Sequence, residues 1–270
     1  MPLQLMSLKL SHENLRRLSM IQLKSLFKLA PALAIKFFKS KKNQLTWDWY
    51  EVWQHAHKKS FTVAKVMRES ILNDIRSSLE KALSEGITFR EFAKELKPTL
   101  QKKGWWGEQI VVDSKGTAEK VQLGSMYRLK TIYRVNMQTA YQTGRYKTQV
   151  DNADDRPYWQ YVAVMDVSTR PEHAELNELV FRYDDPFWNS FYPPNGWNCR
   201  CRVRALSDYK VKSKKIQVGT SDGRLSEDMA LVSKKSGEYA PVTVYTDPLT
   251  GRKIAPDVGW SHNPASGLVD

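Results

Sequence analysis

The spacing of apolar positions predicts helices in the first half of the chain. Between Trp47 and Leu100 apolar residues recur every three to four positions, as they do on the buried face of an amphipathic helix. Ile71, Ile75 and Leu79 begin one such apolar face, which continues to Leu83. We therefore expect a helix over this segment, with that face packed into a core.

Residues typical of helix ends predict a helical hairpin in this region. Gly86 follows the first helix where a left-handed C-cap is expected. Thr88-Phe89-Arg90-Glu91 is a capping-box sequence, in which the Thr hydroxyl and the Glu carboxylate satisfy free backbone N–H groups reciprocally. Pro98 is expected to end this second helix or to lie just past it.

The period of the pattern changes from helical to strand-like after residue 150. Residues 127–149 are predicted to form the longest helix, and residues 110–112 a short extended piece before it. From residue 159 to 165 apolar and polar positions alternate, and residues 179–181 and 199–206 are further candidate strands. The predicted fold class is α+β, with a helical N-terminal half followed by a small domain with an antiparallel sheet.

The same reading divides the chain into four regions. These are a basic helical extension at 1–45, a helical region at 46–126, a core at 127–208 and a basic, partly irregular tail at 209–270. The extension contains leucines at near-helical spacing, is interrupted by Pro31 and ends in a linker-like Lys39–Lys42 cluster. Such a basic amphipathic helix can lie on DNA or a membrane, dock into a partner groove or be an ordinary surface helix.

Composition and charge narrow the environment and the partners. The net charge of +13 favours contact with polyanions, although the same lysines and arginines can simply keep the surface solvated. Two cysteines, both in Cys199-Arg200-Cys201, suit a reducing cytosol and cannot staple a secreted fold. Six basic residues interrupt the apolar stretch from Leu3 to Phe38, so we expect no membrane span.

Three short motifs between residues 166 and 203 are unusually specific in their residue choices. They are Thr169-Arg170-Pro171-Glu172-His173, Asp184-Asp185-Pro186-Phe187-Trp188 and the run from Tyr192 to Val203. In the last, Pro193-Pro194 is expected to adopt polyproline geometry, and Asn195-Gly196 a turn tolerant of positive φ.

The strand that follows is expected to have two chemically different faces. Alternation directs Cys199, Cys201 and Val203 to one side. The other side, here called the arginine face, carries Arg200, Arg202 and Arg204. Three guanidinium groups on one face need compensating anions, for which Asp184 and Asp185 are internal candidates and a phosphate backbone an external one.

These motifs resemble the core of the phage Mu F-like family, also called the phage head morphogenesis domain. The residues that carry the resemblance are Arg170, His173, Asp185, Pro186, Trp188, Pro193, Pro194, Asn195, Gly196, Asn198, Cys199, Arg200 and Cys201. The helix containing Tyr133-Arg134 is similar to a family helix, but Val135-Asn136 replaces the commoner Thr-Glu pair, and Asn177-Glu178 stands where a Gly often occurs.

The resemblance implies a minor capsid component of a tailed bacteriophage or prophage. Family members act at low copy near the portal vertex, in procapsid assembly and in genome packaging or delivery. The implied partners are the phage portal and other head proteins, with double-stranded DNA as a further non-specific partner. The implied location is the virion head, assembled in the host cytoplasm.

The most specific chemical hypothesis for these motifs is a zinc site. His173, Cys199 and Cys201 are zinc-competent ligands within one motif region, and Asp166, Asp185 or water are candidates for a fourth position. The alternative is that no cofactor binds, the cysteines pack as small apolar groups and His173 hydrogen-bonds the Asp-Pro turn.

An enzymatic function is not expected. A cysteine nucleophile paired with His173 would need an oxyanion turn, and no Gly-rich segment flanks Cys199. The alternatives to a head-assembly role are non-specific DNA binding in the phage head and, behind it, a metal-dependent hydrolase or toxin. His55 and His57 are interpreted as surface residues, and the aromatic residues near Trp49 as core-facing.

Overall fold

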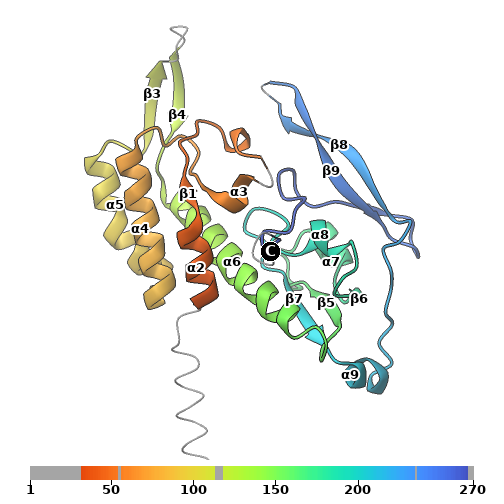
Figure 1. The fold of residues 1–270 in the computed structure, drawn as a ribbon. Helices are drawn as coiled ribbons and strands as arrows, with labels where there is room; N and C mark the ends of the chain where they lie inside the picture. Colours follow the sequence, from red (N-terminus) through yellow and green to blue (C-terminus); the bar gives the residue numbers. More distant parts are fainter. Residues whose placement is uncertain (1–31, 54–55, 113–117, 235, 267–270) are drawn as a thin grey trace, which may run out of the picture.

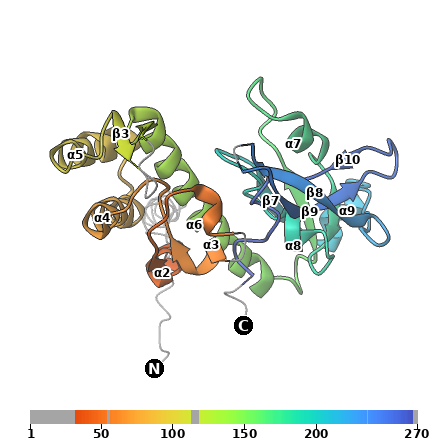
Figure 2. The same ribbon diagram turned by 90° about the horizontal axis from the view of Figure 1, so that it is seen from above.

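The computed structural model describes residues 32–53, 56–112, 118–234 and 236–266, arranged as two units that meet along one long helix. Most of the predicted basic extension, residues 1–31, lies outside the described residues. Figure 1 and Figure 2 show the other longer helices on one side of this long helix and the two three-stranded sheets on the other. None of the described helices is long and apolar enough to span a membrane.

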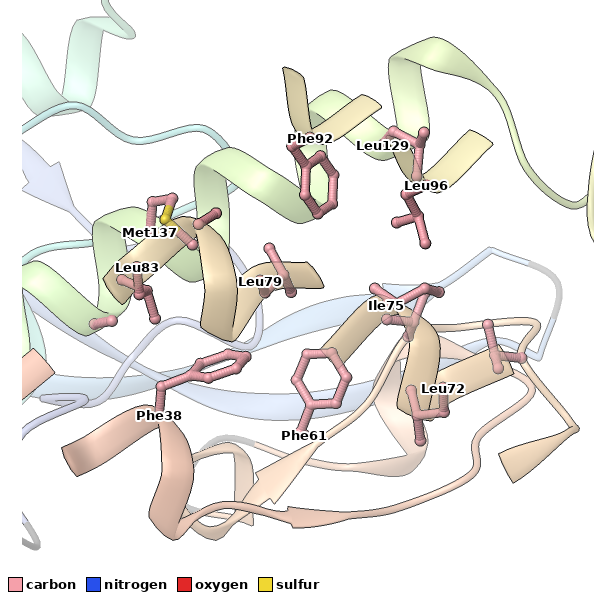
Figure 3. Packing of buried hydrophobic residues seen from close by; sticks show 14 of the residues in the cluster. Phe38, Phe61, Leu72, Ile75, Leu79, Leu83, Phe92, Leu96, Leu129 and Met137 are labelled. Atoms are coloured by element: carbon pink, nitrogen blue, oxygen red, sulfur yellow. The ribbon is translucent and has the colours of Figure 1, made fainter. Parts of the chain in front are cut away.

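The first unit, here called the helical unit, contains four main helices. They are α2 (Ala32–Ser40), α4 (Glu69–Glu85), α5 (Phe89–Lys102) and the first part of α6 (Met126–Asp151). The predicted apolar face of α4 is buried, with Ile75 and Leu79 fully inaccessible. Figure 3 shows these side chains packed against Phe92 and Leu96 of α5 and against Phe38 and Phe61.

The predicted end of α4 and the predicted start of α5 are confirmed. Gly86 has a left-handed φ of 70°, and its N–H donates to the Ala82 carbonyl. Thr88 and Glu91 form the capping box, in which the Thr88 N–H donates to Glu91 Oε2 at 3.0 Å.

The prediction for Pro98 is wrong, because α5 continues through it to Lys102. A proline leaves the carbonyl four residues earlier without its helical partner. Pro98 and Lys94 are both exposed, so water is available to that carbonyl. Leu96 and Leu100, on the opposite side, are buried, and their burial favours the helical path through the proline.

Short elements complete this unit. Residues 110–112 form part of a strand as predicted, and the strand pairs with a second one that the sequence pattern did not reveal. The two strands are β3 (Glu108–Val112) and β4 (Ala118–Gln122). The remaining pieces are β1 (Lys42–Asn43), η1 (Trp49–Glu51), α3 (Ala56–Lys59) and β2 (Ser60–Phe61).

The second unit, here called the sheet unit, is built on an antiparallel sheet with the strand order β6-β5-β7. Its strands are β5 (Tyr158–Val162), β6 (Val180–Arg182) and β7 (Arg202–Leu206). Three short helices accompany them, α7 (Pro171–Glu175), α8 (Trp188–Phe191) and α9 (Asp208–Ser213). The predicted α+β class is therefore confirmed.

Aromatic rings fill the core of the sheet unit. Trp159 and Tyr192 are fully buried, and their ring centroids lie 5.7 Å apart in an edge-to-face arrangement. Trp188 joins them and donates its indole N–H to the Arg182 carbonyl at 2.9 Å, so its one polar atom is satisfied.

The tail from 209 to 270 is more ordered than predicted. It contains β8 (Leu225–Ser233), β9 (Glu238–Thr246) and β10 (Lys253–Ile254), which pair in the order β10-β9-β8. Tyr245 and Ile254 are 2% exposed and belong to the aromatic core. The Lys-, Ser- and Gly-rich composition concealed these strands, because their ordering depends on contact with that distant core.

Helix α6 contributes to both units. Leu129 and Ala140 are buried in the helical core, whereas Tyr146, further along, packs against the aromatic core. Between them the side-chain amides of Gln138 and Gln142 donate to the Cys201 carbonyl at 2.9 and 3.0 Å. Gln149 donates to the Val203 carbonyl at 3.0 Å, and the i, i+4, i+11 spacing places the three glutamines along one helix side.

We predict that Gln142→Ala destabilises the fold although alanine is the better helix former. Gln142 is 3% exposed, so its removal takes one of two donors from the buried Cys201 carbonyl and leaves space behind. The free energy of unfolding should fall by roughly 1–3 kcal/mol in urea titrations. Lys130→Ala, at an exposed α6 position, is the control and should change it by less than about 0.5 kcal/mol. Equal effects would contradict a stabilising role of these amide bonds.

Candidate functional site

The Asp185-Pro186 turn is held by its own aspartate. Asp185 Oδ1 accepts the Phe187 N–H at 2.9 Å, and Asp185 Oδ2 accepts the Ser221 N–H at 3.1 Å. Asp184 pairs instead with Arg182 at 2.8 Å. The sequence had suggested that these two residues compensate the charge of the arginine face, but neither of them does. Asp185 fastens the segment before β8 to the turn that introduces α8.

The Pro193–Gly196 run has a different backbone geometry from that predicted. The Pro193–Pro194 bond is cis, so the pair does not adopt polyproline geometry. Asn195 is 1% exposed, and its Oδ1 accepts the Tyr161 hydroxyl at 3.0 Å while its Nδ2 donates to the Ser190 carbonyl at 3.3 Å. The Asn195 side chain thus ties this run to strand β5.

Gly196 allows the chain to approach Asp257 closely and does not have a positive φ. A Cβ at this position would lie 2.6 Å from the Asp257 carboxylate carbon. Asp257 also forms an ion pair with Arg170 at 3.2 Å, and Arg170 donates to the Trp197 carbonyl at 2.8 Å. The left-handed residue is Asn198, with a φ of 57°. Asparagine tolerates this conformation better than most residues.

His173, Cys199 and Cys201 come together as the sequence predicted, and are here called the His/Cys cluster. Their ligand-capable atoms all lie within 4.8 Å of one another, and all three residues are buried. His173 Nδ1 lies 3.6 Å from Cys199 Sγ and 3.4 Å from Cys201 Sγ. His173 Nε2 is buried and has no hydrogen-bond partner among the described residues. Both cysteines are free thiols.

The two thiols do not ionise alike. The hydrogen bond from Cys199 lowers the pKa of Cys201 to about 7, against the effect of burial and with help from Tyr161 and the Val164 backbone. The same thiol–thiol hydrogen bond, together with burial, raises the pKa of Cys199. Desolvation raises the pKa of the buried Tyr161 hydroxyl well above its usual value. One thiolate is therefore easier to form than two in this cluster.

The carboxylates proposed as a fourth ligand have other partners. Asp166 accepts two hydrogen bonds from the Arg200 guanidinium, at 2.6 and 2.7 Å, which hold its pKa well below the usual range. Asp185 is bound by Ser221. Beside the cluster lies an opening of about 20 Å³, lined in part by Thr169, Asn198 and the cluster residues. This volume is enough for one water molecule.

The predicted two-faced pattern of residues 199–204 is confirmed, although strand β7 begins only at Arg202. Cys199, Cys201 and Val203 are buried, and the three arginines that alternate with them are exposed. Arg200 is engaged by Asp166, and Arg204 donates to Gln160 Oε1 at 3.1 Å. The sequence analysis considered Asp166 as a candidate zinc ligand and missed it as the partner of Arg200.

A second hollow, of about 430 Å³, lies where the two units meet. Its walls include aromatic residues from both units, among them Phe37, Phe61, Trp49, Trp197 and Trp260. Trp49 and Trp197 contact each other edge to face across the junction, with ring centroids 6.2 Å apart.

A buried lysine lines this hollow, which corrects the prediction that residues 39–42 form a linker. Lys41 is 9% exposed and donates to the His57 carbonyl at 2.6 Å. Burial lowers the pKa of Lys41 to about 8. Burial, and then the charge of Lys41, lower the pKa of His57 to about 4. His57 is half-buried and not the surface residue that was predicted, and His55 lies outside the described residues.

Comparison with known proteins identifies the family to which the chain belongs. Residues 73–204 match the family described as "Phage Mu protein F like protein". This stretch runs from α4 to β7 and contains the His/Cys cluster. The chain is a member of the phage Mu F-like family through these residues.

Two relatives extend the similarity over most of the chain. It is 51% identical over 241 residues to the "Putative capsid assembly protein F" of Escherichia phage Mu, covering 88% of this chain and 55% of that protein. It is 43% identical over 224 residues to the "Mu-like prophage FluMu F protein" of Haemophilus influenzae, covering 82% of this chain and 53% of that protein. The chain thus spans about half the length of these relatives. No solved structure matches it significantly.

We predict that Lys41→Met stabilises the protein at neutral pH. Because the pKa of Lys41 falls from 10.5 to about 8 on folding, its charge opposes folding below pH 8 and this cost disappears as pH rises toward 10.5. At pH 7 the free energy of unfolding should rise by roughly 1–3 kcal/mol. Urea unfolding at pH 7 and at pH 10 measures the difference.

Lys42→Met is the matched control, because Lys42 is exposed. It should alter the unfolding free energy little at either pH. An effect of Lys41→Met that stays the same at both pH values would contradict the assignment of the cost to a buried charge.

Proposed function

We propose that this protein is a minor head protein of a tailed bacteriophage or prophage, built into the phage head near the portal vertex and acting in head assembly and genome packaging or delivery. The observation that carries the proposal is the similarity of 88% of the chain to a protein named as a capsid assembly protein. On this proposal its partners are the portal and other head proteins, and it is assembled in the host cytoplasm.

A surface suited to such a partner lies on the β8–β9 hairpin, here called the arm, which extends from the sheet unit in Figure 1. In its antiparallel register Met229 pairs with Pro241 and Leu231 with Tyr239, so all four side chains share one face. Met229, Leu231 and Tyr239 are 58%, 38% and 57% exposed. A group of exposed apolar side chains on one face is typical of a protein-binding surface.

A structural role is also better supported than catalysis. Cys199 and Cys201 are 5% and 2% exposed, and the opening beside them has room for about one water. A substrate therefore has no access to either thiol in this conformation. A hydrolase or toxin activity of the described residues has no comparable support.

Non-specific DNA binding remains the alternative function, resting on the net charge of +13. On the arginine face, Arg200 and Arg204 already have protein partners. Arg202 is exposed and has no ion-pair partner among the described residues. No contiguous row of uncommitted arginines follows β7, so the arm has more specific support than a phosphate-binding surface.

We predict that Met229→Ser/Leu231→Ser/Tyr239→Ser reduces incorporation into heads without unfolding the protein. The three side chains are exposed, so their loss should leave the circular dichroism spectrum and thermal transition nearly unchanged. If the arm contributes about 2–3 kcal/mol to docking, the amount of protein per purified head should fall ten-fold or more. Complementation of a phage that lacks the gene, followed by quantitative immunoblotting of heads, measures this.

Glu227→Gln is the control on the same arm, because Glu227 is exposed and lies outside the apolar group. It should be incorporated like the wild type. Normal incorporation of the triple variant would rule out the arm as the docking surface. Normal head yield and infectivity of the phage lacking the gene would contradict the proposed function itself.

A further inference from the structure

We propose that the His/Cys cluster binds one zinc ion through His173 Nδ1, Cys199 Sγ and Cys201 Sγ. The three atoms come from two segments that are 26 and 28 residues apart in the sequence. The fold brings them together at one buried point. This proposal concerns the stability of the domain and does not depend on where the protein sits in the phage head.

The separations between the ligand atoms match those of a zinc site. Zn–S bonds of about 2.3 Å and Zn–N bonds of about 2.0–2.1 Å at tetrahedral angles place sulfur and nitrogen about 3.5 Å apart. The Sγ···Nδ1 separations here are 3.6 Å for Cys199 and 3.4 Å for Cys201. Both sulfurs therefore already stand at the distance that a shared zinc ion requires.

Hydrogen bonding alone does not account for this convergence. A neutral imidazole nitrogen without a proton has one lone pair, yet both thiol sulfurs approach the same Nδ1. The other nitrogen, Nε2, is buried without a hydrogen-bond partner among the described residues, so it does not fix the ring. One zinc ion would bind the Nδ1 lone pair and both sulfurs at once.

The donor set and its surroundings select zinc. Two thiolates and one imidazole are soft and borderline donors, which favour zinc over magnesium or calcium. Asp166 and Asp185 are engaged by Arg200 and Ser221, so neither is available as a fourth ligand. The opening of about 20 Å³ beside the cluster has room for one water, which would complete the tetrahedron.

Zinc here would act as a clamp. It would join α7, through His173, to the chain entering β7, through the two cysteines. The Cys201 carbonyl accepts the hydrogen bonds from Gln138 and Gln142. Fixing the Cys201 side chain thus also fixes the carbonyl through which α6 holds the sheet unit.

Metal analysis of the full chain tests the proposal. Protein purified under reducing conditions without chelator should contain about one zinc per chain by mass spectrometry of the metal. Cys199→Ser/Cys201→Ser should contain less than about a tenth of that amount. His57→Gln, which changes a half-buried histidine outside the cluster, should retain full zinc. Removal of the ion from the wild type by a strong chelator should lower Tm, and added zinc should restore it.

A cobalt-loaded wild-type protein keeps the test independent of how the variants fold. Co²⁺ in place of zinc should give the intense visible bands of a tetrahedral site and a sulfur-to-metal charge-transfer band in the near ultraviolet. Wild-type protein with less than about a tenth of a zinc per chain and no response to added Zn²⁺ or Co²⁺ overturns the proposal. Full zinc content in the double cysteine variant, or a Cys199–Cys201 disulfide in reduced preparations, would also do so.

Discussion

The carbonyl oxygen of Cys201 is the point on which the arrangement of the two units depends. It accepts hydrogen bonds from two glutamines of α6, while the side chain of the same residue faces His173 on the opposite side. A buried carbonyl that loses its donors costs about 1–3 kcal/mol, so its position is strongly constrained. One residue thereby couples the long helix, the entry to β7 and the His/Cys cluster.

Burying the charge of Lys41 at the junction of the two units costs folding free energy, which the rest of the fold offsets. Lys41 lies in a hollow whose walls include several aromatic rings, and its close partners among the described residues are the His57 carbonyl and the face of Phe37. Burying a charge without a counter-ion opposes folding. The helical and aromatic cores on either side bury enough apolar surface to maintain this geometry. This unfavourable burial lies at the junction, between two cores built of apolar side chains.

How well the sequence predicted each feature depended on the range of the interaction responsible. The α4–α5 turn was predictable because Gly86, Thr88 and Glu91 act within a few residues of one another. The His/Cys cluster was predictable because motif order and strand alternation bring its members together. The path through Pro98, the burial of Lys41 and the ordering of β8–β10 were not predictable, since each depends on packing against distant segments. The same holds for the Asp166–Arg200 pair and the α6 glutamines.

The residues that match the family and the residues of the arm are separate parts of the molecule. Residues 73–204 contain α4, α5, α6, the β5–β7 sheet and the His/Cys cluster, which together make the frame. The arm begins at Leu225, beyond the matched stretch, and carries its apolar face outside both cores. A projecting hairpin can change without disturbing the packing of the frame. The similarity to the phage Mu protein covers 88% of this chain and therefore extends beyond the frame into the arm, so the first strand of the arm is shared with that relative as well.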